Sequence, residues 1–445
     1  PYKQYITYMK YLKFIIFLVL LTACPALKAQ SILTLEEAVR IALENNYDVR
    51  IAANNLTVDR NNVTYGNAGF LPAVGADFSN NNSIEDTRQN RSDGTVREGN
   101  GVKSSGTNYG VGLNWTVFNG FKMFARYDQL KELRTLGEEN LRLAMLNKVA
   151  DVVNLYYDLV QQQRQQAAYD TIITISRSRV NIAQSRFEIG KSSRLEVLNA
   201  QVDFNTDTTN LIRQRTLYYN TRIQLNEQLA RDVNTEFRVV DTIDIDNALV
   251  LNDLSTQAAQ QNPALQVALI NKRIAELDLR QVRADRYPVI GLNAGYNFAN
   301  SRSALGFATT SRGRGFEYGV TASVNIFNGF NQRRLENNAK ISIDNAQLVY
   351  ERTNLNVQSQ LATAYQTYVT SLALMNIEKS NQAIAARNLE ITLDKFKLGS
   401  IATVEFRAAQ VNYINATTRY TTAQYEAKLA EVFLKELSGT LGVGQ

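Results

Sequence analysis

The 445-residue sequence contains no histidine and a single cysteine, Cys24. Catalysis by imidazole, thiol nucleophiles and metal sites built from histidine and cysteine are therefore excluded for nearly all of the chain. An enzyme that uses only carboxylates is the remote exception, and we expect no enzyme, no cofactor and no metal site. Only 5 prolines and 23 glycines interrupt the chain, which favours long regular elements over many short ones.

The N-terminal segment predicts export. Lys10 and Lys13 precede a short apolar run at residues 14–21, and mostly small residues follow it up to Ala29. This order is typical of a secretory signal peptide, because the run is too short to cross a membrane as a helix. We predict a signal peptide over residues 1–29, with cleavage after Ala29. The residues before Cys24 also resemble a lipoprotein processing site, so lipidation of Cys24 is the alternative.

The charge balance gives little support for nucleic-acid binding. The chain has 48 basic and 42 acidic residues, but four of the basic residues and none of the acidic ones lie in residues 1–29. Without that segment the net charge falls from +6 to +2, and we expect no nucleic-acid partner. The rest of the chain has no apolar run long enough for a transmembrane helix, so any membrane crossing requires strands.

The sequence repeats itself with an offset of 209 residues. The motif Phe-Asn-Gly-Phe at residues 118–121 returns at 327–330, and Phe-x-x-Gly at residues 187–190 returns at 396–399. A period this long differs from that of solenoid repeats and indicates a duplicated half-domain. The predicted boundaries are residues 30–231 for repeat 1, 232–253 for a linker and 254–440 for repeat 2.

Each repeat contains two segments in which apolar and small polar residues alternate, as in Tyr109, Val111 and Leu113. This period of two is typical of strands with one apolar face, and a tilted strand of about 10–12 residues is long enough to cross a bilayer. Duplication in an exported chain favours membrane strands over hairpins of a soluble domain. We predict strands at about residues 71–82, 107–118, 287–299 and 316–327, with exposed polar loops at 83–107 and 300–315.

The longest uninterrupted segments follow the two Phe-Asn-Gly-Phe motifs. Apolar residues recur there at spacings of three and four, which predicts helices roughly 100 Å long at about 1.5 Å per residue. Each helix is expected to turn back at a glycine, which argues against a filament-type coiled coil. The predicted elements are long helices 122–187 and 331–396, tips 188–193 and 397–402, and return helices 194–230 and 403–437.

Four membrane strands per chain cannot close a barrel. Open strand edges are costly in hydrocarbon because their backbone groups stay unpaired. A cyclic oligomer is therefore required, with eight strands from two chains or twelve from three. A lumen wide enough for transport favours three, since small barrels are filled by side chains.

The order of helix, proline, strand hairpin, Phe-Asn-Gly, long helix, Phe-x-x-Gly and return helix occurs in both repeats and resembles the TolC family of outer-membrane efflux proteins. The resemblance implies a mixed α and β membrane protein. It implies a homotrimer with a twelve-stranded transmembrane β-barrel in outer-membrane lipid and a long periplasmic α-helical barrel. The implied partners are a periplasmic adaptor (membrane fusion) protein and an inner-membrane RND or ABC pump, and residues 232–253 would join an equatorial region.

We therefore predict a passive exit duct of a tripartite efflux system, which carries small molecules such as drugs through the outer membrane and is gated at its periplasmic tip. A protein-exporting conduit of a type I secretion system is the alternative, because it shares fold and mechanism. An exported structural or adhesive coiled coil is the remote alternative, and it leaves both alternating hairpins unexplained.

Differences between the repeats mark a candidate gate. Glu390 and Asp394 lie four residues apart, on one helical face, where repeat 1 has Asn181 and Ser185. Since the resemblance implies an acidic constriction at the tip, we hypothesise that these carboxylates form it, and solvated charges on a wet helix are the alternative. The candidate latch partners are the repeat 1 arginines Arg177, Arg179 and Arg186.

The two tips are candidate sites for adaptor docking. An exposed apolar residue beside a tight glycine turn is suited to contact a partner, although the glycine also serves the turn itself. The candidate docking residues are Ile189, Gly190, Lys191, Leu398, Gly399 and Ser400.

Overall fold

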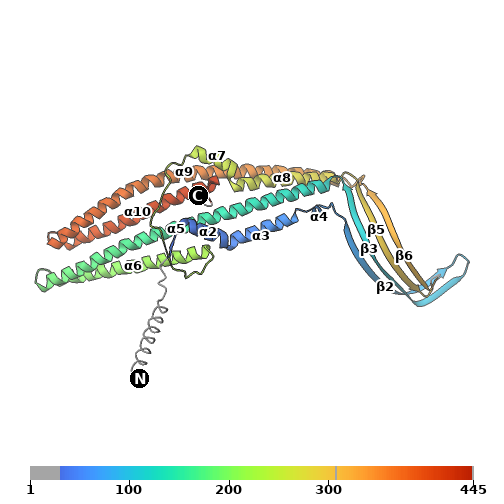
Figure 1. The fold of residues 1–445 in the computed structure, drawn as a ribbon, viewed down its shortest axis with the longest axis horizontal. Coiled ribbons are helices and arrows are strands. Elements are labelled where there is room, and N and C mark those ends of the chain that lie inside the picture. The colour runs from blue at the N-terminus through green and yellow to red at the C-terminus, as the bar shows by residue number, and fades with distance from the viewer. Residues whose placement is uncertain (1–30, 306–307, 443–445) are drawn as a thin grey trace, which may run out of the picture.

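The structure is a computed structural model that describes residues 31–305 and 308–442. Cys24 and the predicted signal peptide lie outside the described residues. The chain is elongated, with a long helical part at one end and a curved four-stranded sheet at the other (Figure 1). No described helix combines the length and the apolar character that a membrane span requires.

The sheet contains the strands of both repeats in the order β2-β3-β5-β6, and all neighbours are antiparallel. The hairpins of the two repeats are joined through β3 and β5, where Gly112 faces Gly295. Among the described residues, β2 and β6 each have one neighbouring strand and form the two edges. The strands are β2 (Ala73–Asn90), β3 (Val96–Asn119), β5 (Val289–Ser303) and β6 (Thr310–Ser323).

The strands extend well beyond the predicted ones at the end far from the helices. Most of residues 83–107, expected to be a loop, is paired strand, and so are both ends of residues 300–315. The ladder continues because backbone pairing does not require apolar side chains, and Ser83 and Ser104 face each other with their hydroxyls 2.7 Å apart. At the other end, β6 stops at Ser323, where the expected strand ran to residue 327.

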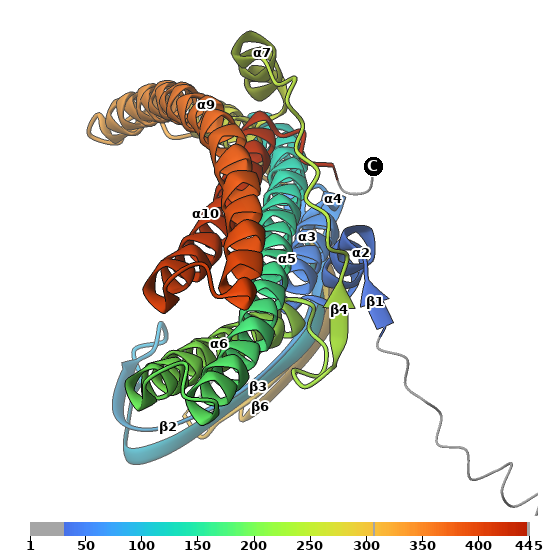
Figure 2. The same ribbon diagram turned by 90° about the vertical axis from the view of Figure 1, so that its left-hand side faces the viewer.

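The helical part consists of two antiparallel hairpins that lie side by side (Figures 1 and 2). Each long helix is the next element after a strand, and it is accompanied by shorter helices. The hairpins are α5 (Lys122–Glu188) with α6 (Arg194–Gln228), and α9 (Asn331–Leu398) with α10 (Thr403–Ser438). The shorter helices are α2 (Leu35–Asn45), α3 (Tyr47–Asn62), α4 (Tyr65–Ala68), α7 (Leu251–Gln261) and α8 (Pro263–Ala284).

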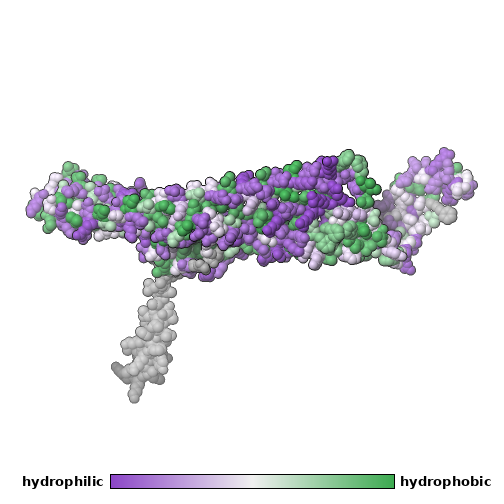
Figure 3. Space-filling view, turned by 90° about the horizontal axis from the view of Figure 1, so that it is seen from above, coloured by the Kyte–Doolittle hydropathy of each residue, from purple (hydrophilic) through white to green (hydrophobic). Residues whose placement is uncertain are grey.

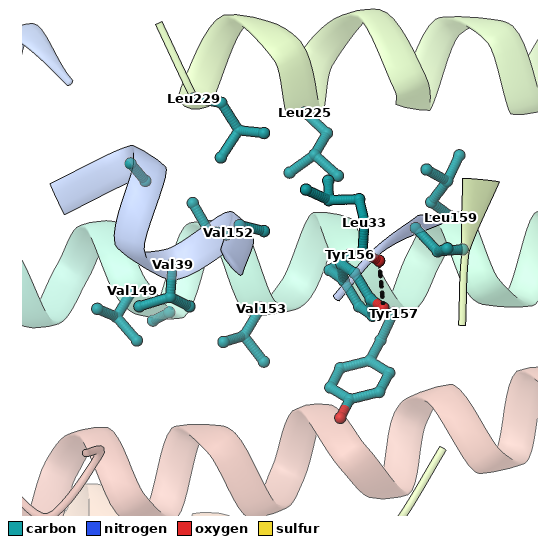
Figure 4. Close-up of a cluster of buried hydrophobic side chains, with 14 of the residues drawn as sticks. Leu33, Val39, Val149, Val152, Val153, Tyr156, Tyr157, Leu159, Leu225 and Leu229 are labelled. Atoms are coloured by element: carbon teal, nitrogen blue, oxygen red, sulfur yellow. Dashed lines mark hydrogen bonds between the residues drawn. The ribbon is translucent and has the colours of Figure 1, made fainter. Parts of the chain in front are cut away.

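The main core lies at mid-length, where α5 is covered on several sides (Figure 4). Val152 and Leu159 of α5 are fully buried there. Tyr156 donates a hydrogen bond to the Leu33 carbonyl (3.0 Å) and accepts one from the Val240 amide (3.2 Å). The tyrosine thereby holds the parallel pair β1 (Ser31–Leu33) and β4 (Phe237–Val239) against the helix. The linker is thus packed across the helical part.

The Phe-Asn-Gly-Phe motifs form the turns from strand to helix in both repeats. Gly120 and Gly329 have φ of 68° and 65°, and the phenylalanines that follow, Phe121 and Phe330, have φ of 67° and 63°. Left-handed backbone is unfavourable for residues other than glycine. The two consecutive left-handed residues explain why glycine stands at this place in each repeat.

We expect Gly120→Ala to destabilise the fold much more than Gly329→Ala. Both substitutions carry the same strain of positive φ, about 1–2 kcal/mol, but only a methyl group on Gly120 would clash with the Ala284 carbonyl and lie 2.8 Å from Cβ of Tyr287. Gly329 has open space around it. Thermal unfolding of both variants in detergent, followed by circular dichroism, measures the difference. Equal losses would show that strain alone matters.

Candidate functional site

The sheet has one apolar and one polar face. Val111, Tyr296 and Phe316 lie opposite one another across β3, β5 and β6, and they share one face. One residue further along each strand, small and polar side chains occupy the other face, including the carboxylate of Glu317. Since side chains alternate between faces, this register gives the sheet one apolar and one polar surface.

Both helical hairpins turn at a left-handed glycine, Gly190 with φ of 74° and Gly399 with φ of 77°. The backbone N–H of the next residue donates to a carbonyl of the preceding helix, as in helix ends closed by glycine. Ile189 and Leu398 precede these glycines and are 66% and 84% exposed. Each tip thus presents one apolar side chain to solvent.

Behind the tips, aromatic stacking joins α9 to α10. Phe396 and Phe406 are both fully buried, with ring centroids 4.8 Å apart and nearly parallel planes. Arg186 of the first hairpin donates to the Phe396 carbonyl (2.6 Å), and its guanidinium lies 4.9 Å from the centroid of the Phe396 ring. This arginine therefore connects the two tips by a hydrogen bond and a cation–π contact.

A buried ionic cluster connects the two return helices, α6 and α10. Arg407 donates to both carboxylate oxygens of Asp207 (2.7 and 2.9 Å), and Ser176 donates to the same carboxylate (2.6 Å). Arg179 donates to Asp203 (2.7 Å), which also lies 3.5 Å from Arg407. We call these five residues the interhairpin cluster. With two cations and two anions it is neutral, which makes its burial tolerable.

The guanidinium of Arg407 stays charged in this cluster. Burial disfavours the charged form, but the hydrogen bonds and the charge of Asp207, together with Asp203, outweigh burial and raise the pKa of Arg407. Asp207 is 5% exposed and Arg179 is 3% exposed. Both hairpins contribute to the cluster, so its bonds must break if the hairpins move apart there.

Sequence comparison decides the family. The sequence model described as "Outer membrane efflux protein" matches residues 38–231 and 254–440, which are the two repeats. The chain belongs to the outer membrane efflux protein family. It is an outer-membrane protein, and its relatives are channel proteins, which supports the expectation that it is no enzyme. The resemblance seen in the sequence is thereby confirmed.

This outer membrane efflux protein is similar along most of its length to two relatives and to two solved structures. It is 21% identical over 433 residues to outer membrane protein TolC of Escherichia coli (strain K12), covering 93% of this chain and 83% of TolC. It is 18% identical over 421 residues to outer membrane efflux protein BepC of Brucella suis, covering 93% and 86% of the two chains. The outer-membrane channels OprN and Campylobacter jejuni CmeC superpose with TM-scores of 0.75 and 0.74, at 17% and 18% identity. Both matches cover 92% of this chain, and they cover 91% of OprN and 86% of CmeC.

The predicted gate acids lie on the last turns of α9 and are exposed. Glu390 accepts a hydrogen bond from Arg387 (2.6 Å), and Asp394 forms an ion pair with Lys397 (3.4 Å). Both partners are three residues away on the same helix. Within one chain, these carboxylates therefore pair with neighbours on the surface of their own helix. An acidic constriction requires the carboxylates of several copies to come together, and it remains a prediction.

The three predicted latch arginines have other partners within the described chain. Arg177 lies over the ring of Phe204 (5.8 Å to the centroid), Arg179 pairs with Asp203, and Arg186 contacts Phe396. The structure does not bring any of them to Glu390 or Asp394 within one chain. Arg179 and Arg186 nevertheless lie between the two hairpins, and a latch between neighbouring chains stays a prediction.

Sequence reasoning missed the acidic half of the interhairpin cluster and Arg407. At the equivalent positions of the other repeat, Asp203 and Asp207 correspond to Asn412 and Ala416, and Arg407 corresponds to Leu198. The signal was therefore present as broken repeat symmetry on the return helices. The charge differences on the long helices alone, such as Glu390 against Asn181, do not point to this pairing.

We expect Arg407→Ala to loosen the contact between the hairpins by about 3–5 kcal/mol, because it leaves a buried carboxylate without its cation. The matched control is Arg387→Ala, whose ion pair with Glu390 is 69% and 63% exposed and is worth about 1 kcal/mol at most. Hydrogen–deuterium exchange of α6 and α10 near the tips measures the effect. Unchanged protection in Arg407→Ala would contradict a stabilising cluster.

Proposed function

We propose that this protein is the outer-membrane exit duct of a tripartite efflux system, a passive conduit for small molecules gated at its periplasmic tip. The observation that carries the proposal is the four-stranded amphipathic sheet with β2 and β6 at its edges. Such a sheet cannot stay open in lipid, since each unpaired backbone group at its edges costs several kcal/mol. Pairing of β6 with β2 of a neighbouring copy removes both edges.

Three copies give a closed barrel of twelve strands, and the polar face then lines its lumen. Small residues on that face support an open passage: Gly110 and Gly112 of β3 and Gly291 and Gly295 of β5 all lie on it. Eight strands from two copies would leave room for little more than side chains. We therefore infer a homotrimer whose apolar face contacts outer-membrane lipid.

The helical hairpins would continue this duct into the periplasm. The two long helices have 67 and 68 residues, so each extends about 100 Å at 1.5 Å per residue. Because both tips lie at the same end of the molecule (Figure 1), six such hairpins in a trimer can form the wall of a single tube. The tube would meet a periplasmic adaptor protein and an inner-membrane pump at the tips.

The gate proposal places Glu390 and Asp394 at the narrow end of this tube. Six carboxylates from three copies would attract cations and repel anions there. Their exposure within one chain and their position on the last turns of α9 support this placement. Of the repeat 1 arginines, Arg177 is exposed and is the proposed partner across chains, whereas Arg179 and Arg186 could reach a neighbouring chain only after their contacts with Asp203 and Phe396 break.

We expect the double variant Glu390→Ala/Asp394→Ala to change conductance and to lose block by divalent cations, because it removes the carboxylates from the constriction. Single-channel recording of the purified trimer in planar bilayers measures both. Glu351→Ala is the control, since Glu351 is an exposed acid on the same helix far from the tip. A double variant with unchanged conductance and block would refute the gate assignment.

We expect the tips to contact an adaptor protein in cells. A single cysteine at Lys191 or Ser400, in a Cys24→Ser background, should capture an adaptor with a short thiol-reactive cross-linker. A cysteine at Glu351 provides the control, as this position is also exposed but lies far along the helix from both tips. Capture at Glu351 and at the tips alike, or capture at none of them, would contradict tip docking.

Deletion of the gene tests the function itself. Loss of an exit duct for small molecules raises the accumulation of a fluorescent dye and sensitivity to drugs, and reintroduction of the gene restores both. Unchanged dye accumulation together with loss of a secreted protein would instead assign the chain to type I secretion. Normal dye efflux with an unchanged secretome would reject both transport functions.

A further inference from the structure

Four exposed cations occupy the apolar face of the sheet just beyond its aromatic rows. They are Lys103 of β3, Arg302 of β5, and Arg312 and Arg314 of β6. The register fixes their face, because cross-strand partners and every second residue along a strand share one side. Figure 3 shows the end of the sheet far from the helices as predominantly hydrophilic.

The register also fixes the level of these cations. Arg314 lies opposite Phe298, which lies opposite Tyr109, so the first cation shares a row with the outermost aromatic residues. Arg312 and Arg302 lie in the next two rows outward. The apolar face of β5 extends from Ile290 to Phe298, about the 9–11 residues that a tilted strand needs to cross hydrocarbon. The cations therefore lie at the level of the lipid headgroups on the outer side.

No carboxylate accompanies them on this face among the described residues from the Phe298 row out to Lys103. Asp77 and Glu317 lie on the opposite face, as their cross-strand partners Gly110 and Gly295 place them. Glu85 pairs with Val102, one residue away from Lys103, and so lies on the opposite face as well. None of the four cations forms an ion pair within the described part of the chain.

The inner rim of the sheet differs. Lys122 lies 2.8 Å from Asp285, and Arg286 makes paired hydrogen bonds with Glu336, one of them 2.8 Å long. Lys122 and Arg286 are thus neutralised by the chain itself, whereas the four cations of the outer rows are not. From the Phe298 row out to Lys103 the cations lie on one face and the carboxylates on the other, an arrangement that suits a negatively charged molecule outside the chain.

We propose that this face binds the phosphorylated sugar headgroup of an outer-leaflet lipid. This inference rests on the proposed function, because it requires the sheet to stand in the outer membrane with its apolar face toward lipid. Guanidinium groups bind phosphate oxygens in pairs. The hydroxyl and amide side chains that share the rows with the arginines provide hydrogen bonds for sugar hydroxyls.

The side chains that stand beside Arg312 and Arg302 in their rows across the sheet are uncharged and polar. Asn80, Thr107 and Asn300 share the row of Arg312, and Asn82, Ser105 and Thr310 share the row of Arg302. At the outer end, Lys103 and Arg302 also line one hollow together with Asn82 and Ser105. This combination favours a phosphorylated saccharide over a simple anionic phospholipid, whose headgroup offers fewer hydroxyl groups.

The test uses the purified full-length trimer and the triple variant Arg302→Gln/Arg312→Gln/Arg314→Gln. Binding is measured by native mass spectrometry with a bis-phosphorylated disaccharide lipid, its dephosphorylated form and phosphatidylglycerol. We expect the triple variant to bind the bis-phosphorylated lipid about a hundredfold more weakly, since each cation near a charged lipid surface contributes roughly a factor of five. The charge-matched control on α9, Lys340→Gln/Arg352→Gln/Lys379→Gln, should bind like the parent.

Three results would overturn the inference: unchanged binding by the triple variant, equal affinity of the parent for the dephosphorylated lipid, or equal affinity for phosphatidylglycerol. Arg312→Gln alone, with an expected loss of about fivefold, serves if the triple variant does not assemble. Conductance and trimer mass are recorded on the same samples. A parent that forms conducting trimers without preferring the phosphorylated lipid refutes this inference alone, whereas a parent that forms no channel refutes the proposed function.

Discussion

The antiparallel register between β3 and β5 is the constraint on which the rest of the structure depends. It is the only strand pairing between the two repeats among the described residues. Because side chains alternate, a slip by one residue would move every aromatic residue of one hairpin to the polar face. The register also places the starts of α5 and α9, since each helix follows its strand through a Phe-Asn-Gly-Phe turn. Nearly equal helix lengths then bring both tips to the same end of the molecule (Figure 1).

Repetition builds this scaffold, and departures from it supply the specific contacts. The acids Asp203 and Asp207 occur only in the first hairpin and Arg407 only in the second, so the interhairpin cluster cannot form between two identical halves. A perfectly symmetrical chain would place like charges, or none, on both return helices. Asymmetry therefore gives each hairpin a defined neighbour within the chain, and the opposite side of each hairpin remains for a neighbouring copy.

The sequence predicted the elements better than their ends and contacts. Periodicity located the long helices because Pro and Gly are nearly absent from them, and it located the strands where one face is apolar. Periodicity did not reveal the strands between residues 83 and 107, because an alternating hydropathy pattern marks strands with one face in an apolar environment. Backbone pairing does not require such a pattern. The cluster around Arg407 was also out of reach, since its partners are about 200 residues apart and α6 has no strong apolar stripe to fix its orientation. Only the positions that differ between the repeats pointed to it.

The strands are longer than the hydropathy pattern predicts, because backbone pairing continues beyond the part of the sheet that has an apolar face. β3 has 24 residues, close to 80 Å at about 3.3 Å per residue, whereas bilayer hydrocarbon is about 30 Å thick. Even a strongly tilted strand must therefore project beyond the lipid, and its outer half needs side chains that tolerate water and headgroups. Serine, asparagine and threonine meet that need on both faces, whereas from the Phe298 row out to Lys103 the cations lie only on the apolar face. Water alone would not distinguish the two faces in these rows, so the asymmetry of charge at Arg302, Arg312 and Arg314 supports the proposed anionic headgroup on the outside of the sheet.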